Sequence, residues 1–213
     1  MSSPGRVVLG VDGGNTKTIA LIARLDGTIV GWARSGSTDI HDAPGAAAAI
    51  IELRRAITDA CVMAGAAPDD IAHAVLGLAG ADCAEDADVL GAGIDDLITG
   101  PAVILNDAIN AIRCGTPDGI GVSVVCGTGG AAAAVNAAGG AYFQGQWPEA
   151  SGGRELGRQG LAVLEDSGAD GELAERARRF AGGTDERAFA PDVLAAARQG
   201  DTRALRIVHD QGR

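Results

Sequence analysis

A glycine-rich turn near the start of the chain carries a carboxylate, an ammonium group and two hydroxyl groups. Its sequence is Gly10-Val11-Asp12-Gly13-Gly14-Asn15-Thr16-Lys17-Thr18, and an apolar run lies on each side. Because glycine has no Cβ, backbone N–H groups in such a turn can approach a polyphosphate closely. Lys17 can offset phosphate charge, and the hydroxyls of Thr16 and Thr18 can donate hydrogen bonds. Asp12 can hold a hydrated Mg²⁺, although an ordinary β-hairpin with an Asp-Gly turn is the alternative interpretation.

A second glycine-rich turn, Cys126-Gly127-Thr128-Gly129-Gly130, lies between two runs that are expected to be strands. It can cradle the β and γ phosphates of a nucleotide. Glycine-rich hairpins are common, so this pattern is weak by itself. Together with the first turn, it suggests two lobes that close on one nucleotide. The residues predicted to bind that nucleotide are Gly13, Gly14, Asn15, Thr16, Lys17, Gly127, Thr128 and Gly129.

A carboxylate follows the apolar run Ala102-Val103-Ile104-Leu105, in the segment Asn106-Asp107-Ala108 that opens a helix. A carboxylate at the carboxyl end of a central strand points toward the crevice where open α/β sheets bind ligands. There Asp107 can accept a proton from an attacking hydroxyl group, which is general base catalysis. Helix N-capping is the alternative role for Asp107, and both roles can coexist. Asn106 is predicted to contact the substrate beside it.

Two further segments are candidates for binding a sugar. Gly80 lies in Gly77-Leu78-Ala79-Gly80-Ala81-Asp82 and can shape the floor of a sugar pocket, or the segment can be only a strand-to-helix turn. Trp147 and Glu149 form a pair that suits a sugar ring and its hydroxyl groups, although a lone Trp more often serves packing. The three histidines (His41, His73, His209) are scattered, which indicates structural or exposed positions.

Composition excludes several classes of partner. The chain has 213 residues, a formal net charge of −11, 46% hydrophobic residues and 21% charged residues, as in soluble globular proteins. Nucleic-acid and anionic-membrane binding depend on basic residues, so this charge argues against both. No leader sequence and no apolar run of roughly 20 residues is apparent. The four cysteines lack a Cys-x-x-Cys spacing and are expected to be small buried hydrophobes in a reduced, cytoplasmic protein.

The element order predicts an α/β fold. Three strands are followed by helix, strand, helix and strand, the order of a ribonuclease-H-like domain. A second unit begins near Pro117 and becomes helical, so the predicted domains are residues 1–116 and 117–213. Expected strands are Arg6–Val11, Thr18–Arg24, Ile29–Arg34, Ala74–Ala79, Ala102–Leu105, Gly121–Cys126 and Ala131–Asn136, the fourth and fifth buried. Expected helices are Pro44–Met63, Asp86–Ile98, 153–166, 171–181, 186–198 and 201–210.

These segments, in this order, resemble the BadF/BadG/BcrA/BcrD-type ATPase family, which includes N-acetylglucosamine kinases. The family belongs to the superfamily of actin, sugar kinases and heat-shock chaperones. The matching pieces are Asp12–Thr18, Gly77–Gly80, Asn106–Ala108, Cys126–Gly129, the weaker Ser151–Gly157, and the helix pair Ala190–Ala204. The resemblance implies an actin-like ATPase lobe, a second helix-rich lobe, and ATP-Mg²⁺ bound between them. It also implies that Asp107 takes the proton of an amino-sugar hydroxyl as that hydroxyl attacks the γ-phosphate.

The chain also departs from the family pattern. Family members continue beyond the last residue here, into late strands and a Gly-Gly motif that holds adenosine, so the second lobe is expected to be incomplete. Gly130 stands where Ser often occurs, and Glu149 where Asp is usual. The leading hypothesis is a kinase of N-acetylglucosamine or glucosamine. The alternative is a truncated, catalytically impaired relative that binds sugar or nucleotide, and exposed apolar surface on a partial lobe would favour a homodimer.

A third interpretation from the same family is an ATPase activator of a 2-hydroxyacyl-CoA dehydratase. Such a protein holds a metal cluster with cysteines across a dimer. Cys126 lies close to the second glycine-rich turn, but no second cysteine is suitably spaced. This interpretation is therefore the least favoured of the three.

Overall fold

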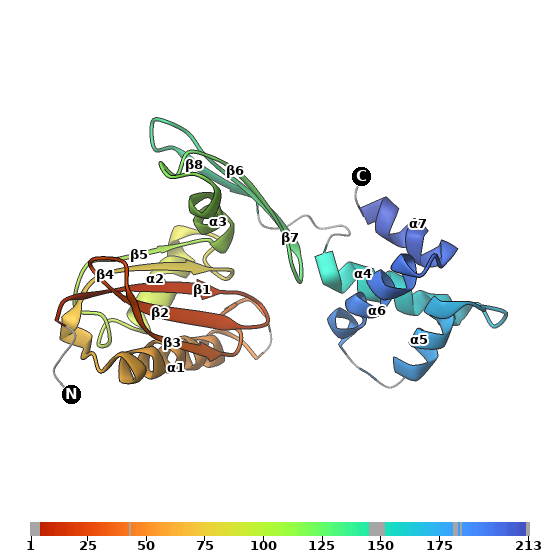
Figure 1. The fold of residues 1–213 in the computed structure, drawn as a ribbon, viewed down its shortest axis with the longest axis horizontal. Helices are drawn as coiled ribbons and strands as arrows, with labels where there is room; N and C mark the ends of the chain where they lie inside the picture. Colours follow the sequence, from red (N-terminus) through yellow and green to blue (C-terminus); the bar gives the residue numbers. More distant parts are fainter. Residues whose placement is uncertain (1–4, 43, 145–151, 181–182, 184, 212–213) are drawn as a thin grey trace. The chain divides into compact units, whose positions relative to one another are not determined.

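The chain folds into two units. A computed structural model describes residues 5–42, 44–144, 152–180, 183 and 185–211. Unit 1 comprises residues 1–123 and 133–143, and unit 2 comprises residues 124–132 and 144–213. Figure 1 shows the elements of both units.

Three apolar runs at the start of unit 1 form an antiparallel meander. Alternate residues of these runs are buried, as expected for strands with one face on a core. The Asp26-Gly27 turn joins the second and third strands, and the Asp26 carboxylate accepts a hydrogen bond from the Thr28 N–H at 2.9 Å. The strands are β1 (Val7–Gly13), β2 (Thr18–Arg24) and β3 (Ile29–Ser35).

Two parallel strands complete this sheet beside β1. They are β4 (Ile71–Leu78), which follows the 3-10 turn η1 (Pro68–Asp70), and β5 (Ala102–Leu105). The sheet order is β3-β2-β1-β4-β5, with β4 parallel to β1 and β5 parallel to β4. The predicted ribonuclease-H-like α/β order is therefore confirmed. The expectation that β5 is buried is wrong, because β5 lies at the sheet edge and Val103 is 54% exposed.

Helix α1 (Ala46–Ala64) covers one face of β2 and β3 (Figure 1). A Cβ on Gly31 of β3 would lie 2.5 Å from the Ala60 carbonyl oxygen, so helix and sheet approach closely there. Apolar spacing predicts this contact, since residues at helical intervals form one stripe. The buried stripe consists of Ala49, Leu53, Ala56, Ile57, Ala60 and Cys61.

Two shorter helices follow the parallel strands of unit 1. Helix α2 (Ala84–Ala92) precedes β5, and helix α3 (Asp107–Gly115) starts directly after it. The helix predicted over Asp86–Ile98 thus ends early, at Gly93, and the chain continues as turns. Leu90, Ile94 and Ile98 are nevertheless buried in the core of unit 1.

A separate three-stranded sheet has the order β6-β7-β8. Its strands are β6 (Gly121–Cys126), β7 (Gly130–Val135) and β8 (Ala141–Gln144), of which β8 was not predicted from the sequence. Burial was expected for all four cysteines, and it holds only for Cys61. Cys83, Cys114 and Cys126 are exposed because they lie at a helix start, a helix end and a strand end.

Helices form the core of unit 2. Phe180 and Phe189 place their ring centroids 5.1 Å apart, and Leu173 and Val193 are fully buried. The Asp185 side chain accepts a hydrogen bond from the Arg187 N–H and caps the following turn. None of the described helices is both long and apolar enough to span a membrane. The elements are α4 (Gly152–Leu161), η2 (Ala162–Glu165), α5 (Glu172–Phe180), η3 (Glu186–Phe189), α6 (Ala190–Arg198) and α7 (Thr202–Gln211).

Candidate functional site

The first glycine-rich turn is a tight hairpin between β1 and β2. The Gly14 N–H donates to the Lys17 carbonyl at 2.9 Å, so Asn15 and Thr16 are the two residues at the tip. Gly13 has no room for a side chain, because a Cβ there would overlap the Thr38 hydroxyl and lie 2.6 Å from Leu78 Cδ2. The hairpin interpretation and the phosphate-binding interpretation are therefore compatible at the level of the backbone.

Buried hydroxyl groups fasten this turn to the segment after β3. Thr18 Oγ donates to the Gly36 carbonyl at 2.8 Å and lies 3.2 Å from Thr38 Oγ. Both threonines are fully buried. Thr18 was expected to donate to a phosphate, and this is wrong because its hydroxyl lies inside unit 1 and already has a protein acceptor.

Two charged side chains of the turn face solvent. Asp12 is exposed at the carboxyl end of β1, where it pairs with Gly77 of the parallel strand β4. Lys17 is also exposed, and it is the only lysine in the 213 residues. Asn15 donates from Nδ2 to the Asp39 carboxylate at 2.6 Å, which fixes the tip of the turn.

Asp107 opens helix α3, but Asn106 is the residue that caps it. The Asn106 side chain accepts a hydrogen bond from the Ala108 N–H at 2.9 Å, and Asn106 is only 3% exposed. Capping does not therefore require Asp107, and the alternative role considered for this carboxylate belongs to its neighbour. Asp107 is the first helical residue and stays partly exposed.

The surroundings of Asp107 favour its protonated form. Burial raises the pKa of Asp107 above its ordinary value, and the Ala108 N–H acts in the opposite direction. The negative charges of Asp12, Asp82 and Asp39 raise this pKa further. A carboxyl group whose pKa is raised accepts a proton more readily, which suits a general base.

The loop after β4 lies against the segment after β3. Gly80 is buried, and a Cβ there would lie 2.7 Å from the Ile40 backbone nitrogen. Asp82 of the same loop accepts a hydrogen bond from Asn106 Nδ2 at 3.0 Å. Burial raises the pKa of Asp82, which the positive charge of His41 opposes. Unit 1 thus brings together four of the predicted residues, Asp12, Gly80, Asn106 and Asp107, with two that were not predicted, Asp39 and Asp82.

The second glycine-rich turn belongs to unit 2, where it meets the start of α4. The N–H groups of Gly153 and Arg154 donate to the carbonyls of Gly127 and Thr128 at 2.8 and 2.9 Å. Gly127 donates in turn to the Gly129 carbonyl at 2.9 Å. Among the described residues, none beyond the chain neighbours has an atom within 4 Å of the Cβ positions of Gly127 and Gly129, so this part of the structure leaves open space beside them.

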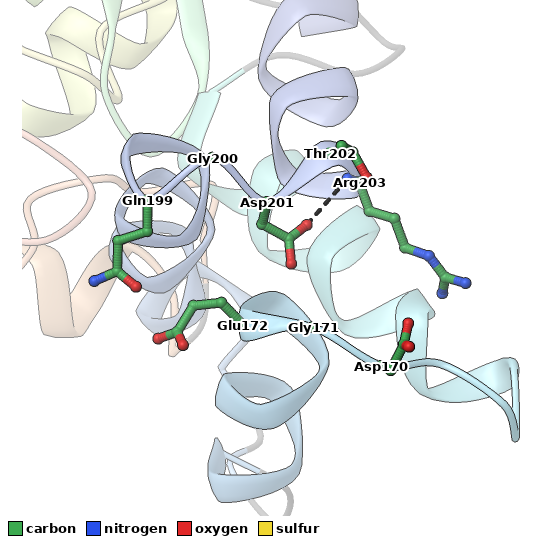
Figure 2. A pocket seen from close by; sticks show the side chains of 8 residues that line it. All are labelled: Asp170, Gly171, Glu172, Gln199, Gly200, Asp201, Thr202 and Arg203. Atoms are coloured by element: carbon green, nitrogen blue, oxygen red, sulfur yellow. Dashed lines mark hydrogen bonds between the residues drawn. The ribbon is translucent and has the colours of Figure 1, made fainter.

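Trp147 and Glu149 lie outside the described residues, so their predicted role in sugar binding stays a prediction. A pocket elsewhere in unit 2 is lined by none of the predicted site residues (Figure 2). Asp201 points into it and accepts hydrogen bonds from the N–H groups of Leu173, Arg203 and Ala204. The carboxylate therefore caps α5 and α7, and the pocket is a junction between helices.

Comparison with known protein families identifies the chain. Residues 9–213 match the sequence profile of the BadF/BadG/BcrA/BcrD ATPase family. The chain belongs to this family. No curated protein matches the chain.

Solved structures of other proteins have the same fold as this chain. A proposed N-acetylglucosamine kinase from Chromobacterium violaceum is 22% identical, with a TM-score of 0.76 over 98% of this chain and 80% of that one. A proposed N-acetylglucosamine kinase from Porphyromonas gingivalis is 17% identical, with a TM-score of 0.74 over 96% and 77%. A ROK family glucokinase from Streptomyces griseus, solved with glucose and AMPPNP, is 19% identical, with a TM-score of 0.65 over 96% and 75%.

Proposed function

We propose that the protein is an ATP-dependent kinase that phosphorylates an amino sugar, N-acetylglucosamine or glucosamine, with Asp107 as the general base. The observation that carries the proposal is the environment of Asp107 in a member of an ATPase family. Its carboxyl group lies at the end of β5, is not needed as the helix cap, and has a raised pKa. These features suit a group that accepts the proton of an attacking hydroxyl.

Asp12 is the proposed ligand of Mg²⁺. Magnesium in phosphoryl-transfer enzymes is usually held by one or two carboxylates, together with phosphate oxygens and water. The described residues contain no group of three or more His, Cys, Asp or Glu side chains that could hold a metal ion. The exposed carboxylate of Asp12 fits a magnesium site in which one protein carboxylate acts together with phosphate oxygens and water. When bound, ATP-Mg²⁺ supplies the phosphoryl group and neutralises part of its charge.

The remaining roles follow from position and chemistry. Lys17 and the turn residues Gly13, Gly14, Asn15 and Thr16 are proposed to bind phosphate oxygens, as are Gly127, Thr128 and Gly129 in unit 2. Asn106 and Gly80 are proposed to contact the sugar beside Asp107, together with Trp147 and Glu149. The two similar solved structures named as proposed N-acetylglucosamine kinases support this substrate class.

The test is ADP release from Mg²⁺-ATP with a panel of amino sugars. Wild type should show sugar-dependent turnover, and Asp107→Asn should lower it by about 10²- to 10⁴-fold. Asp88→Asn is the matched control, because it removes an exposed carboxylate of α2 without touching α3. Turnover that survives in Asp107→Asn would refute the role of Asp107.

A second experiment separates a kinase from a binding-only relative. An amine-reactive reagent can modify only Lys17 and the chain terminus, because the chain has no other lysine. ATP-Mg²⁺ should protect Lys17 from modification, as measured by mass spectrometry. Protection without sugar-dependent ADP release would favour a catalytically impaired protein that binds nucleotide. No protection and no turnover would refute both functions.

The proposal extends to three features of the whole protein. The domain division at residues 116 and 117 stays a prediction, as do the cytoplasmic location and the homodimer. Size-exclusion chromatography with light scattering would test the last of these.

A further inference from the structure

The start of helix α3 depends on one buried side chain. Asn106 accepts from the Ala108 N–H with Oδ1 and donates from Nδ2 to Asp82 Oδ1 at 3.0 Å. Among the described residues, the other acceptor near Nδ2 is the Ala79 carbonyl, at 3.5 Å, which is the limit of a hydrogen bond. The Asp82 carboxylate is therefore the main partner that orients the Asn106 amide.

Asp82 is itself held in place from two sides. The Asp86 carboxylate accepts from the backbone N–H groups of Asp82 and Cys83, at 3.1 and 3.2 Å. His41 Nε2 lies 3.1 Å from the same carboxylate oxygen, which ties this loop to the segment after β3. A fixed loop lets Asp82 act as a rigid support for Asn106.

A second contact holds the body of α3 against β4. A Cβ on Gly77 would lie 2.6 Å from the Asn110 side chain, one turn into the helix. This contact does not involve Asp82, so loss of the Asp82–Asn106 hydrogen bond is expected to affect the first turn of the helix. Asp107 lies in that first turn.

We propose that Asp82 is a positioning residue, which orients Asn106 and thereby sets the direction of the Asp107 carboxyl group. This inference rests on the proposed function of Asp107. The physical reason is that a catalytic base must lie within hydrogen-bond reach of its proton, and small displacements reduce the rate strongly. Asp82 does not touch the substrate in this role. Asn106, which it orients, is a proposed sugar contact, so loss of Asp82 should lower kcat, and any rise in KM should accompany that fall.

Paired substitutions at residue 82 test the proposal. Asp82→Ala removes the acceptor, and we expect kcat for sugar-dependent ADP release to fall by about 10- to 100-fold. Asp82→Asn keeps an oxygen that can accept from Asn106 Nδ2, and should restore kcat to within about threefold of wild type. Asp88→Ala is the control for the loss of a nearby carboxylate, because Asp88 lies on α2, which follows the loop that contains Asp82. All variants are assayed at the same pH.

A structural measurement keeps the proposal testable even if the protein is not a sugar kinase. The Ala108 amide proton bonds to Asn106, so its hydrogen exchange reports the state of the cap. Exchange should speed up about tenfold or more in Asp82→Ala and stay close to wild type in Asp82→Asn. Unchanged exchange in Asp82→Ala would overturn the proposal, whatever the activity. A raised KM with unchanged kcat would overturn it too, since Asp82 would then be a sugar ligand.

An inactive wild type with the expected exchange pattern would refute the proposed kinase function but leave the role of Asp82 at the helix start intact. Loss of activity in Asp82→Asn equal to that in Asp82→Ala would overturn the positioning role. The charge of Asp82 would then matter, and not its hydrogen bond.

Discussion

The two glycine-rich turns have similar compositions but different surroundings. In unit 1, Gly13 is required by its neighbours, since a Cβ would overlap Thr38 and lie 2.6 Å from Leu78. In unit 2, no described residue beyond the chain neighbours has an atom within 4 Å of the Cβ positions of Gly127 and Gly129. Glycine is thus a packing requirement in the first turn, while packing does not explain it in the second.

This difference separates two reasons for glycine that look alike in a sequence. A glycine at a position with no room for a Cβ is required by the fold, and its replacement lowers stability. A glycine beside open space leaves room for the close approach of a ligand. Unit 2 contains both kinds, since Gly152 has φ of +81° and its Cβ would lie 2.6 Å from the Gly129 carbonyl carbon.

The largest effect is expected for Gly13→Ala. The added methyl group would force Thr38 and Leu78 apart in the core of unit 1, which should lower the free energy of unfolding by about 3 kcal/mol. The matched variant Gly127→Ala should stay within about 0.5 kcal/mol of wild type. Urea unfolding of each variant measures the difference. Equal losses of stability in both variants would contradict this difference, because Gly127 would then also be required for packing.

Gly152→Ala sharpens the comparison inside unit 2. Its positive φ and the approach of Gly129 both oppose a side chain, so we expect a loss of about 2 kcal/mol. The loss should appear as faster exchange of buried amides of unit 2, such as those of Leu173 and Val193, with unit 1 unchanged. If Gly127→Ala destabilised these amides as much as Gly152→Ala, the second turn would also be a packing device.

Sequence patterns predicted the strands and helices around this site better than the hydrogen bonds between its side chains. Apolar runs located β1, β2 and β3, and the run before Asn106 located β5. Strand β8 (Ala141–Gln144) was not predicted because it has only four residues and follows two glycines. Helix α2 was predicted too long, since apolar positions continue past Gly93 as buried turn residues.

The candidate site shows the same limit. Asp12 and Asp107 could be found because each comes after an apolar run, where a carboxylate is conspicuous. The links from Asn15 to Asp39 and from Asn106 to Asp82 join residues 24 positions apart in each case. Only the packing of the loops after β3 and β4 brings these side chains together, and no local pattern indicates it. The cap role of Asn106 could have been predicted, because Asn is as good an N-cap as Asp.

Asp107→Asn tests whether the proposed catalytic base of unit 1 lowers the stability of the fold. The folded state raises the pKa of Asp107, so ionisation of this group destabilises the fold. Its contribution to stability is favourable below the ordinary value of 3.8 and is lost as the pH rises through the raised value. The variant should therefore be more stable than wild type at pH 8, by about 1 kcal/mol. The gain should shrink toward pH 3.5, as measured by thermal unfolding, and a gain independent of pH would contradict this cause.

The smallest effect is expected at His41, where the loop after β3 meets Asp86. The hydrogen bond to Asp86 raises the pKa of His41 above 6.5, despite partial burial. Protonated His41 therefore stabilises the fold fully below about pH 6.5, and this contribution disappears as the pH rises through the raised value. Because the side chain is 46% exposed, the effect should be about 0.5 kcal/mol or less. His41→Gln keeps a donor for Asp86 without titrating, so wild type should exceed it in stability at pH 5.5 and match it at pH 9. A constant difference across this range would show that the link between the two loops depends on the shape of His41 and not on its charge.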